Sequence, residues 1–205
     1  MQIVRVEAVP STQDAAWGLP TGTVVVAEHQ TAGRGRLGRR WEAPPGSALL
    51  ASWVMPVHEL APLAAGVAAA RACGDAVRLK WPNDLLLDGR KLGGIIIERT
   101  GHTCVVGTGI NLHWAPPGAA ALGVDRDELL GRMATEMTRW FAATAQEVRS
   151  RWRERSDTLG RLVRVQLSDE TFEGMAEDIG PDGTLIVAGR TFAAGDVVHL
   201  RPSER

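Results

Sequence analysis

The sequence lacks the features that most directly mark a nucleic-acid, metal or membrane protein. Its 23 basic and 24 acidic side chains nearly cancel, so no global field would hold it on DNA or on an acidic membrane. The two cysteines, Cys73 and Cys104, lie far apart, and the five histidines show no zinc spacing, which predicts a reducing compartment and no structural metal. The chain opens without a basic and then apolar leader, and no apolar run is long enough to span a bilayer. We therefore expect a cytoplasmic protein without a membrane partner.

Two motifs that would indicate a chemistry are also missing. A Walker A loop needs Gly-Lys-Ser or Gly-Lys-Thr after its spacer, and neither is present, so any ATP is held in another way. The Gly-x-Ser-x-Gly turn is absent, and neither cysteine has an activating neighbour in the sequence. These absences disfavour a hydrolase.

The apolar pattern predicts one main domain followed by a small module. The 205 residues suffice for one well-buried core and an appendage. Beyond Gly160 the pattern changes to short strands separated by turns, which is typical of a small β-barrel docked on the main domain. The predicted domains are residues 1–159 and 160–205. Expected strands cover residues 3–9, 23–27, 48–55, 77–80, 94–98, 102–106, 162–167, 171–176, 185–187 and 197–200, and expected helices cover residues 59–73 and 127–143, with a further helix that ends near Thr158.

The most informative stretch is residues 33–41, with the sequence GRGRLGRRW. Its glycines let the backbone approach a ligand closely, and its arginines offer planar, permanent charges that suit phosphate or carboxylate. The spacing of Gly33, Gly35 and Gly38 matches the dinucleotide fingerprint, but that motif requires a helix directly afterwards. Two prolines and no helical period follow instead. We therefore reject a Rossmann site and expect an anion-binding loop rather than a solvated basic turn.

Further polar residues are expected to gather near this loop. The Asp88-Gly89 turn predicts a hairpin across which Lys80, Asn83, Asp84 and Lys91 converge. Joining a carboxylate to the α-phosphate of a nucleotide brings two anions together, so fixed cations must surround the reacting oxygens. A glycine-rich loop that folds over the product would protect it from water. This set of residues fits a carboxylate-activating ligase.

The start of the first helix allows two interpretations. Ser11-Thr12-Gln13-Asp14 fits the spacing of a helix N-cap followed by an acidic residue. A helix start also leaves backbone N–H groups without partners, so a polar ligand can lie beside it. We favour the cap for Ser11, although the two interpretations do not exclude each other.

Four motifs together resemble the successive signatures of biotin–protein ligases. They are GRGRLGRRW at residues 33–41, KWPND at 80–84, KLGGI at 91–95 and GTGIN at 107–111, in the order of that family. The resemblance implies a class II synthetase-like α+β domain, a mixed β-sheet with flanking helices, followed by an SH3-like barrel. It also implies that ATP, Mg²⁺ and biotin yield biotinyl-5′-adenylate, and that a lysine of a biotin carboxyl carrier domain accepts biotin.

The resemblance also implies a role for individual residues. Lys91, Arg36, Arg34 and Asp84 are the expected catalytic residues, with Lys91 beside the biotin carboxylate and the α-phosphate. Asp84 is expected to position the acceptor amine or to act on its proton. The expected binding residues for biotin and ATP are Ser11, Thr12, Gln13, Gln30, Gly33, Arg34, Gly35, Arg36, Arg39, Trp41, Lys80, Asn83, Lys91, Gly93, Gly109 and Asn111.

Two departures from the family pattern affect these expectations. Gln13 stands where many relatives carry Asn, which leaves its individual role open. Ten residues precede Ser11, too few for an N-terminal helix-turn-helix, so we expect a monofunctional enzyme without nucleic-acid binding, as a monomer or a weak homodimer. The alternatives are a lipoate or octanoyl ligase or transferase, and a binding module for biotin or adenylate without turnover.

Overall fold

A mixed sheet forms the centre of the main domain. The structure is a computed structural model that describes residues 1–200. The seven strands lie in the order β1-β2-β3-β7-β6-β5-β4; β1 and β2 pair in parallel, and the other neighbours pair antiparallel. The strands are β1 (Gln2–Val9), β2 (Thr23–Gln30), β3 (Ala48–Pro56), β4 (Arg78–Lys80), β5 (Asp84–Leu87), β6 (Arg90–Thr100) and β7 (Thr103–Asn111).

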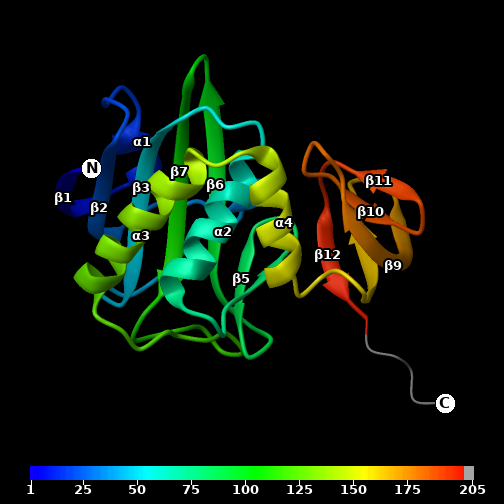
Figure 1. Cartoon of the computed structure of the whole chain (residues 1–205). Coiled ribbons are helices and arrows are strands. Elements are labelled where there is room, and N and C mark those ends of the chain that lie inside the picture. Colours follow the sequence, from blue (N-terminus) through cyan, green and yellow to red (C-terminus); the bar gives the residue numbers. More distant parts are fainter. Residues whose placement is uncertain (201–205) are drawn as a thin grey trace.

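Helices flank this sheet (Figure 1). The helix α2 (Ala61–Cys73) is nearly all buried, because its alanines and Gly66 let it pack closely against the sheet and its neighbours. The helix α3 (Arg126–Phe141) packs against α2 with its buried apolar stripe. The remaining helices are α1 (Thr12–Ala16), the short 3₁₀ turn η1 (Arg36–Gly38) and α4 (Ala145–Arg155). None of the helices within residues 1–200 is long and apolar enough to cross a membrane.

The two faces of the sheet have different neighbours. Trp53, Ile95 and Val106 belong to the large core beneath α2 and α3. Side chains alternate along a strand, so their neighbours Ser52 and Ile96 point to the opposite face. A smaller apolar cluster, which includes Val25 and Ala16, lies on that second face beside α1. The part of this second face that α1 does not cover can border a binding site.

A five-stranded sheet forms the C-terminal module, in the order β11-β10-β9-β8-β12. Trp81 connects it to the main domain, since the indole Nε1 donates to Gly183 O at 3.2 Å. Arg153 of α4 pairs with Asp178 at 2.6 Å. The module therefore packs against the main domain, as expected (Figure 1). Its strands are β8 (Leu162–Gln166), β9 (Thr171–Ile179), β10 (Leu185–Val187), β11 (Arg190–Phe192) and β12 (Asp196–His199).

The predicted fold class, a mixed sheet with flanking helices and a small C-terminal β module, is confirmed. One strand was not predicted: β11 begins at Arg190, between the expected strands 185–187 and 197–200. Ala188 and Gly189 both have positive φ, 45° and 76°, so they complete a tight hairpin turn on their own. The boundary at Gly160 falls between α4 and β8, and it stays a prediction. The last five residues of the predicted second domain, 201–205, lie outside the described residues.

Candidate active site

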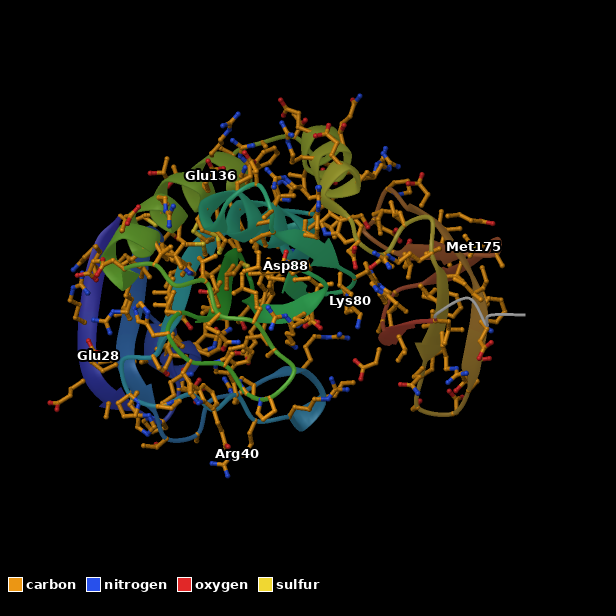
Figure 2. The ribbon with its side chains drawn as sticks, turned by 90° about the horizontal axis from the view of Figure 1, so that it is seen from below. Glu28, Arg40, Lys80, Asp88, Glu136 and Met175 are labelled. Atoms are coloured by element: carbon orange, nitrogen blue, oxygen red, sulfur yellow. The ribbon has the colours of Figure 1, made fainter. Side chains whose placement is uncertain are left out.

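A cavity of about 300 Å³ lies on the face of the main sheet that α2 and α3 do not cover. Its floor includes Ser52 of β3, Ile96 of β6 and Gly107 of β7. One wall comes from α1 and another from the loop 33–41, and Asp196 of β12 reaches it from the C-terminal module. Figure 2 shows Lys80, a further lining residue, on the side of the main domain that faces this module. The cavity thus lies where the two predicted domains meet.

One end of the cavity is polar and uncharged. The amide N–H and the hydroxyl of Thr12 lie 2.7 and 2.9 Å from Gln30 Oε1. The Ser52 hydroxyl donates to Gln13 Oε1 at 3.1 Å and lies 2.9 Å from Thr12 Oγ1. Three oxygen–oxygen contacts therefore share two hydroxyl hydrogens, so one of the three contacts has no hydrogen and its oxygens can accept one from a ligand. This end offers both donors and acceptors to a neutral polar ligand.

The N-cap interpretation of Ser11 is confirmed. Its side chain accepts a hydrogen bond from Gln13 N at 3.2 Å, and it is buried at the start of α1. The helix therefore holds Thr12 and Gln13 in place, and the Gln13 amide donates to Val105 O at 2.9 Å. Ser11 lines the cavity while it acts as the cap, so both interpretations describe the same residue.

Trp41 forms the apolar middle of the cavity. A Cβ built at Gly109 would lie 2.5 Å from the Trp41 ring, so a glycine is needed for the ring to lie this close to β7. Likewise, a Cβ at Gly107 would lie 2.6 Å from Gln13 Oε1. The indole Nε1 of Trp41 is buried and has no hydrogen-bond partner among the described residues. The glycines of the GTGIN motif thus give space to an aromatic ring and an amide.

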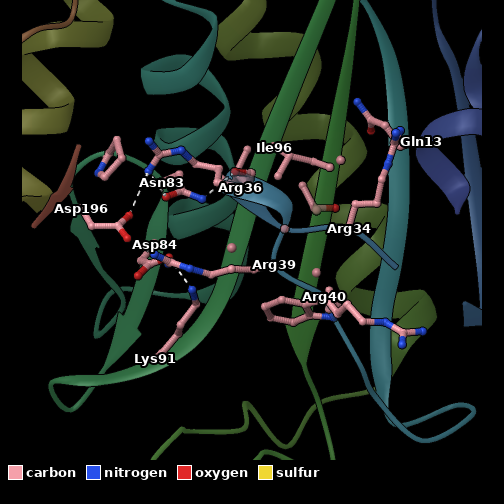
Figure 3. A pocket seen from close by; sticks show the side chains of 18 of the residues that line it. Gln13, Arg34, Arg36, Arg39, Arg40, Asn83, Asp84, Lys91, Ile96 and Asp196 are labelled. Carbon is pink, nitrogen blue, oxygen red and sulfur yellow. Dashed lines mark hydrogen bonds and ion pairs between the residues drawn. The ribbon is translucent and has the colours of Figure 1, made fainter. Parts of the chain in front are cut away.

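The other end of the cavity carries a group of cations. Lys91 Nζ lies 2.6 Å from Asp84 Oδ1, and the two side chains point toward one another in Figure 3. Arg36 donates to Asn83 Oδ1 at 3.2 Å. Lys80 joins this group. Burial lowers the pKa of Lys80 below its usual range, Lys91 lowers it further, and Asp84 partly offsets both effects.

The loop cations reach across to the C-terminal module. Arg36 Nη1 lies 3.8 Å from Asp196 Oδ1, and Arg39 pairs with the same carboxylate. Burial lowers the pKa of Arg36 as well, with Asp84 acting against it and Arg39 adding to it. Two carboxylates, Asp84 and Asp196, thus face four cations, which are Arg36, Arg39, Lys80 and Lys91. An added anion would be attracted to this end.

Arg34 lies apart from this group. Its Nη2 is 2.7 Å from Asp14 Oδ1 and 3.1 Å from Glu98 Oε1. Lys91 and Glu98 are seven residues apart on β6, which is about 23 Å at the usual strand rise. Figure 3 shows Arg34 beside Gln13 and away from Lys91. The structure therefore does not bring Arg34 to the predicted catalytic group.

Most of the sequence-predicted site residues line the cavity, but three do not. Gly33 lies at the start of the loop, where its carbonyl accepts from Trp41 N at 2.9 Å. Gly93 lies within β6, opposite Ile110. Asn111 is buried, and its amide donates to Ala120 O at 2.9 Å, so its role as a nucleotide contact stays a prediction. The lining set contains Ser11, Thr12, Gln13, Gln30, Arg34, Gly35, Arg36, Arg39, Trp41, Lys80, Asn83, Asp84, Lys91 and Gly109.

Sequence reasoning missed several residues of the cavity. Ser52 had one signal, because it is a hydroxyl within an otherwise apolar strand. Gly107 belongs to the GTGIN motif but was not singled out. Asp196, Gln166 and Val198 come from the C-terminal module, and no local pattern indicates how that module packs.

The fold and the cavity define a class of site in which a mixed sheet and a small β module border a cavity that is polar at one end and cationic at the other, which suits an extended ligand with an anionic end. A model of the biotin/lipoate A/B protein ligase family matches residues 6–113. A model of the biotin protein ligase C-terminal domain matches residues 158–200. The chain therefore belongs to the biotin/lipoate A/B protein ligase family. The predicted resemblance to biotin–protein ligases is confirmed.

Curated relatives and solved structures agree with this assignment. The chain is 38% identical to a biotin--[acetyl-CoA-carboxylase] ligase of Mycobacterium tuberculosis, over 88% of this chain and 80% of that protein. It is 32% identical to the bifunctional ligase/repressor BirA of Escherichia coli, over 82% of this chain and 62% of that protein. The fold resembles a biotin protein ligase from Aquifex aeolicus in complex with biotin and ATP, with a TM-score of 0.84, 24% identity and coverage of 98% and 99%. It also resembles a biotin protein ligase from Leishmania major in complex with biotinyl-5-AMP, with a TM-score of 0.70, 26% identity and coverage of 98% and 99%.

Proposed function

We propose that the protein uses ATP to convert biotin to biotinyl-5′-adenylate and then transfers the biotinyl group to a lysine of a biotin carboxyl carrier domain. One observation carries the proposal: the cavity changes along its length from neutral polar groups, through an apolar middle, to a group of cations. Biotin has the same order of chemistry, with a neutral ureido ring, an apolar ring and chain, and a carboxylate. The membership of this chain in the biotin/lipoate A/B protein ligase family supports the same reaction.

Thr12, Gln13, Gln30 and Ser52 bind the ureido ring in this proposal. The ring offers two N–H donors and a carbonyl acceptor, and a site built to pair such groups rejects analogues that lack them. Two hydroxyls and two amides surround this end of the cavity. Trp41 then contacts the apolar part of the ligand.

The cationic end supports the first reaction. A carboxylate oxygen of biotin attacks the α-phosphorus of ATP, and the bond from that phosphorus to the pyrophosphate oxygen breaks as the new P–O bond forms. Both reactants are anions, so Lys91 and Arg36 stabilise the charge that gathers on the phosphoryl oxygens. Lys80 and Arg39 add to the field, and Asn83 orients Arg36 through their hydrogen bond at 3.2 Å.

The same cations favour the second reaction. The acceptor lysine must be neutral to attack, and nearby positive charge lowers the pKa of an amine. Its nitrogen attacks the carbonyl carbon, the C–O bond to the phosphate breaks, and AMP leaves. Asp84, which borders the cavity beside Lys91, orients the amine and accepts the proton that the nitrogen loses.

Magnesium enters with ATP in this proposal. Within residues 1–200 no group of three or more His, Cys, Asp or Glu side chains could hold a metal ion. Mg²⁺ usually keeps several waters and binds substrate phosphates with one or two carboxylates, and Asp84 and Asp196 are two carboxylates that line the cationic end. When bound, the ion would neutralise further phosphate charge.

The acceptor is proposed to be the carrier domain of an acyl-CoA carboxylase, because the Mycobacterium tuberculosis relative is a ligase for acetyl-CoA-carboxylase. The reaction would take place in the cytoplasm, and the protein would act without nucleic acid. Residues 1–159 would bind both substrates, and the module from residue 160 onward would complete the cavity through Asp196.

A transfer assay tests the proposal. The protein is incubated with ATP, Mg²⁺, a biotin carboxyl carrier domain and either biotin or lipoate. We expect the carrier to gain the mass of one biotinyl group, and a carrier whose acceptor lysine is replaced by arginine to gain none. Transfer of lipoate in place of biotin would favour the alternative ligase, and adenylate binding without any transfer would favour a binding module.

A further inference from the structure

Arg34 is bound by carboxylates from two different elements. Asp14 lies in the first turn of α1, and Glu98 lies on β6. The same guanidinium nitrogen, Nη2, is within 2.7 Å of the Asp14 carboxylate and 3.1 Å of the Glu98 carboxylate. The loop 33–41 is thereby tied to both the helix and the strand that border the cavity.

Trp17 fixes the orientation of Glu98. The indole Nε1 donates to Glu98 Oε2 at 3.0 Å, while Oε1 faces Arg34. Both carboxylate oxygens therefore have a partner. A carboxylate that is held by an indole loses less rotamer freedom when it pairs with an arginine than a free side chain would.

Holding Arg34 restrains the whole loop. Trp41 N donates to Gly33 O at 2.9 Å, and Gly35 N donates to Arg39 O at 2.7 Å. Arg34 and Arg40 form an isolated β-bridge. The loop is therefore a small hairpin whose strands move together, and a contact at one residue limits the movement of its neighbours.

The contact lies at the polar end of the cavity. Ile96 lines the floor, and Glu98 lies two residues further along β6, on the same face of the strand. Asp14 directly follows Gln13 on α1. The loop is thus held at the end where the ureido ring is proposed to bind, while Arg36 and Arg39 reach Asp196 at the other end.

We propose that Asp14 and Glu98, with Glu98 oriented by Trp17, form a latch on Arg34 that keeps the loop closed over the ureido end. We call this set of four residues the loop latch. Its effect on the intermediate rests on the proposed function. Asp14 and Glu98 act through Arg34, so they are positioning residues, and Arg34 has the same anchoring role.

The test uses the double variant Asp14→Asn and Glu98→Gln. Both changes remove a charge and keep the size of the side chain, and the amide oxygen of Gln can still accept from Trp17. Each partly exposed ion pair contributes little, so losing both should have a moderate effect: we expect biotinyl-adenylate to leave the double variant about five-fold faster. Release is measured by chasing labelled adenylate with an excess of unlabelled adenylate, which requires no carrier domain.

Asp127→Asn is the matched control. Asp127 also lies in the first turn of a helix and pairs with Arg5 at 2.8 Å, with side-chain exposures of 59% and 49%. The corresponding values for Asp14 and Arg34 are 56% and 43%. The control should leave the release rate unchanged, so a change in the double variant is not a general effect of losing a surface ion pair.

Two further measurements separate the latch from a structural role. In an Arg34→Ala background, the double variant should release adenylate no faster than Arg34→Ala alone, since partners in one contact are not additive. Amide hydrogen exchange at Gly35 and Trp41 should be faster in the double variant without any substrate. Additive effects on release, or unchanged exchange at both amides, would overturn the latch. Faster exchange in a protein that transfers no biotin would retain the latch and reject the proposed function.

Discussion

Replacing Lys91 by alanine should slow adenylate formation strongly and leave the fold intact. The Lys91 ammonium lies beside Asp84 at the cationic end of the cavity, with a side-chain exposure of 43%. A cation about 4 Å from a phosphoryl charge contributes about 1 kcal/mol in water and about 4 kcal/mol at an effective dielectric constant of 20. The partly exposed ammonium falls between these limits. We take about 3 kcal/mol, which corresponds to a rate loss of roughly 100-fold.

The effect of the same change on stability should be small. A partly exposed ion pair contributes at most about 1 kcal/mol, so the denaturant midpoint should move little. Arg90→Ala is the matched control, because Arg90 is the exposed preceding residue on β6 and does not line the cavity. It removes an equal charge about one residue away and should keep the wild-type rate.

The assay is biotin-dependent release of pyrophosphate in the absence of a carrier domain. It isolates the first reaction, so a loss cannot come from failed docking of the acceptor. A near-normal rate in Lys91→Ala would remove Lys91 from the catalytic role. An equal loss in Arg90→Ala would show that net charge, rather than the position of Lys91, sets the rate.

Three further changes test other parts of the site. Arg36→Ala should release the adenylate at least about ten-fold faster, because a hydrogen bond from a charged group contributes about 1.5–3 kcal/mol. Mass spectrometry should then find biotin on lysines of an added unrelated protein. Unchanged selectivity for the carrier lysine would contradict the role of Arg36 in retention of the adenylate. Gly107→Ala would place a methyl 2.6 Å from Gln13 Oε1, so the KM for biotin should rise roughly ten-fold while the KM for ATP stays constant; equal changes in both constants would contradict a local effect. Burial and the neighbouring Lys80 lower the pKa of His199 below 6.5, so between the folded and unfolded pKa values the unfolded chain binds more protons than the folded chain. The free energy of unfolding should therefore rise with pH up to the unfolded pKa. His199→Gln should flatten this rise in urea unfolding, and an unchanged slope of the free energy against pH would rule out His199 as its source.

Much of the site could be predicted because its residues lie in short motifs with a physical reason behind their spacing. The hairpin signal at Asp88-Gly89 correctly brought Lys80 and Lys91 to one end of the cavity. The helix-cap spacing correctly placed Ser11 at the start of α1. In each case the interaction connects residues that are close in sequence, and local rules describe such contacts well.

Contacts between distant elements could not be predicted in this way. Asp196 lies in a different module from Arg36, and their proximity depends on how that module packs, which no short pattern encodes. The sequence also makes the arginines of the loop look equivalent. Arg34 differs from Arg36 because Asp14 and Glu98 happen to meet at its position, and those carboxylates belong to separate elements of the fold.

The carboxylates around the loop explain how the protein can hold so many cations around one cavity. Without counter-ions, Arg36 and Arg39 would repel one another, so Asp196 lowers the energy of the ligand-free state. In the proposed reaction a phosphate of ATP would compete with Asp196 for the same guanidinium groups, and this exchange of one anion for another would leave both arginines neutralised. Asp14 and Glu98 lie too far from the cationic end to be displaced by that phosphate. In the proposed mechanism the Asp196 end of the loop therefore responds to the nucleotide, while the loop latch holds Arg34 at the ureido end.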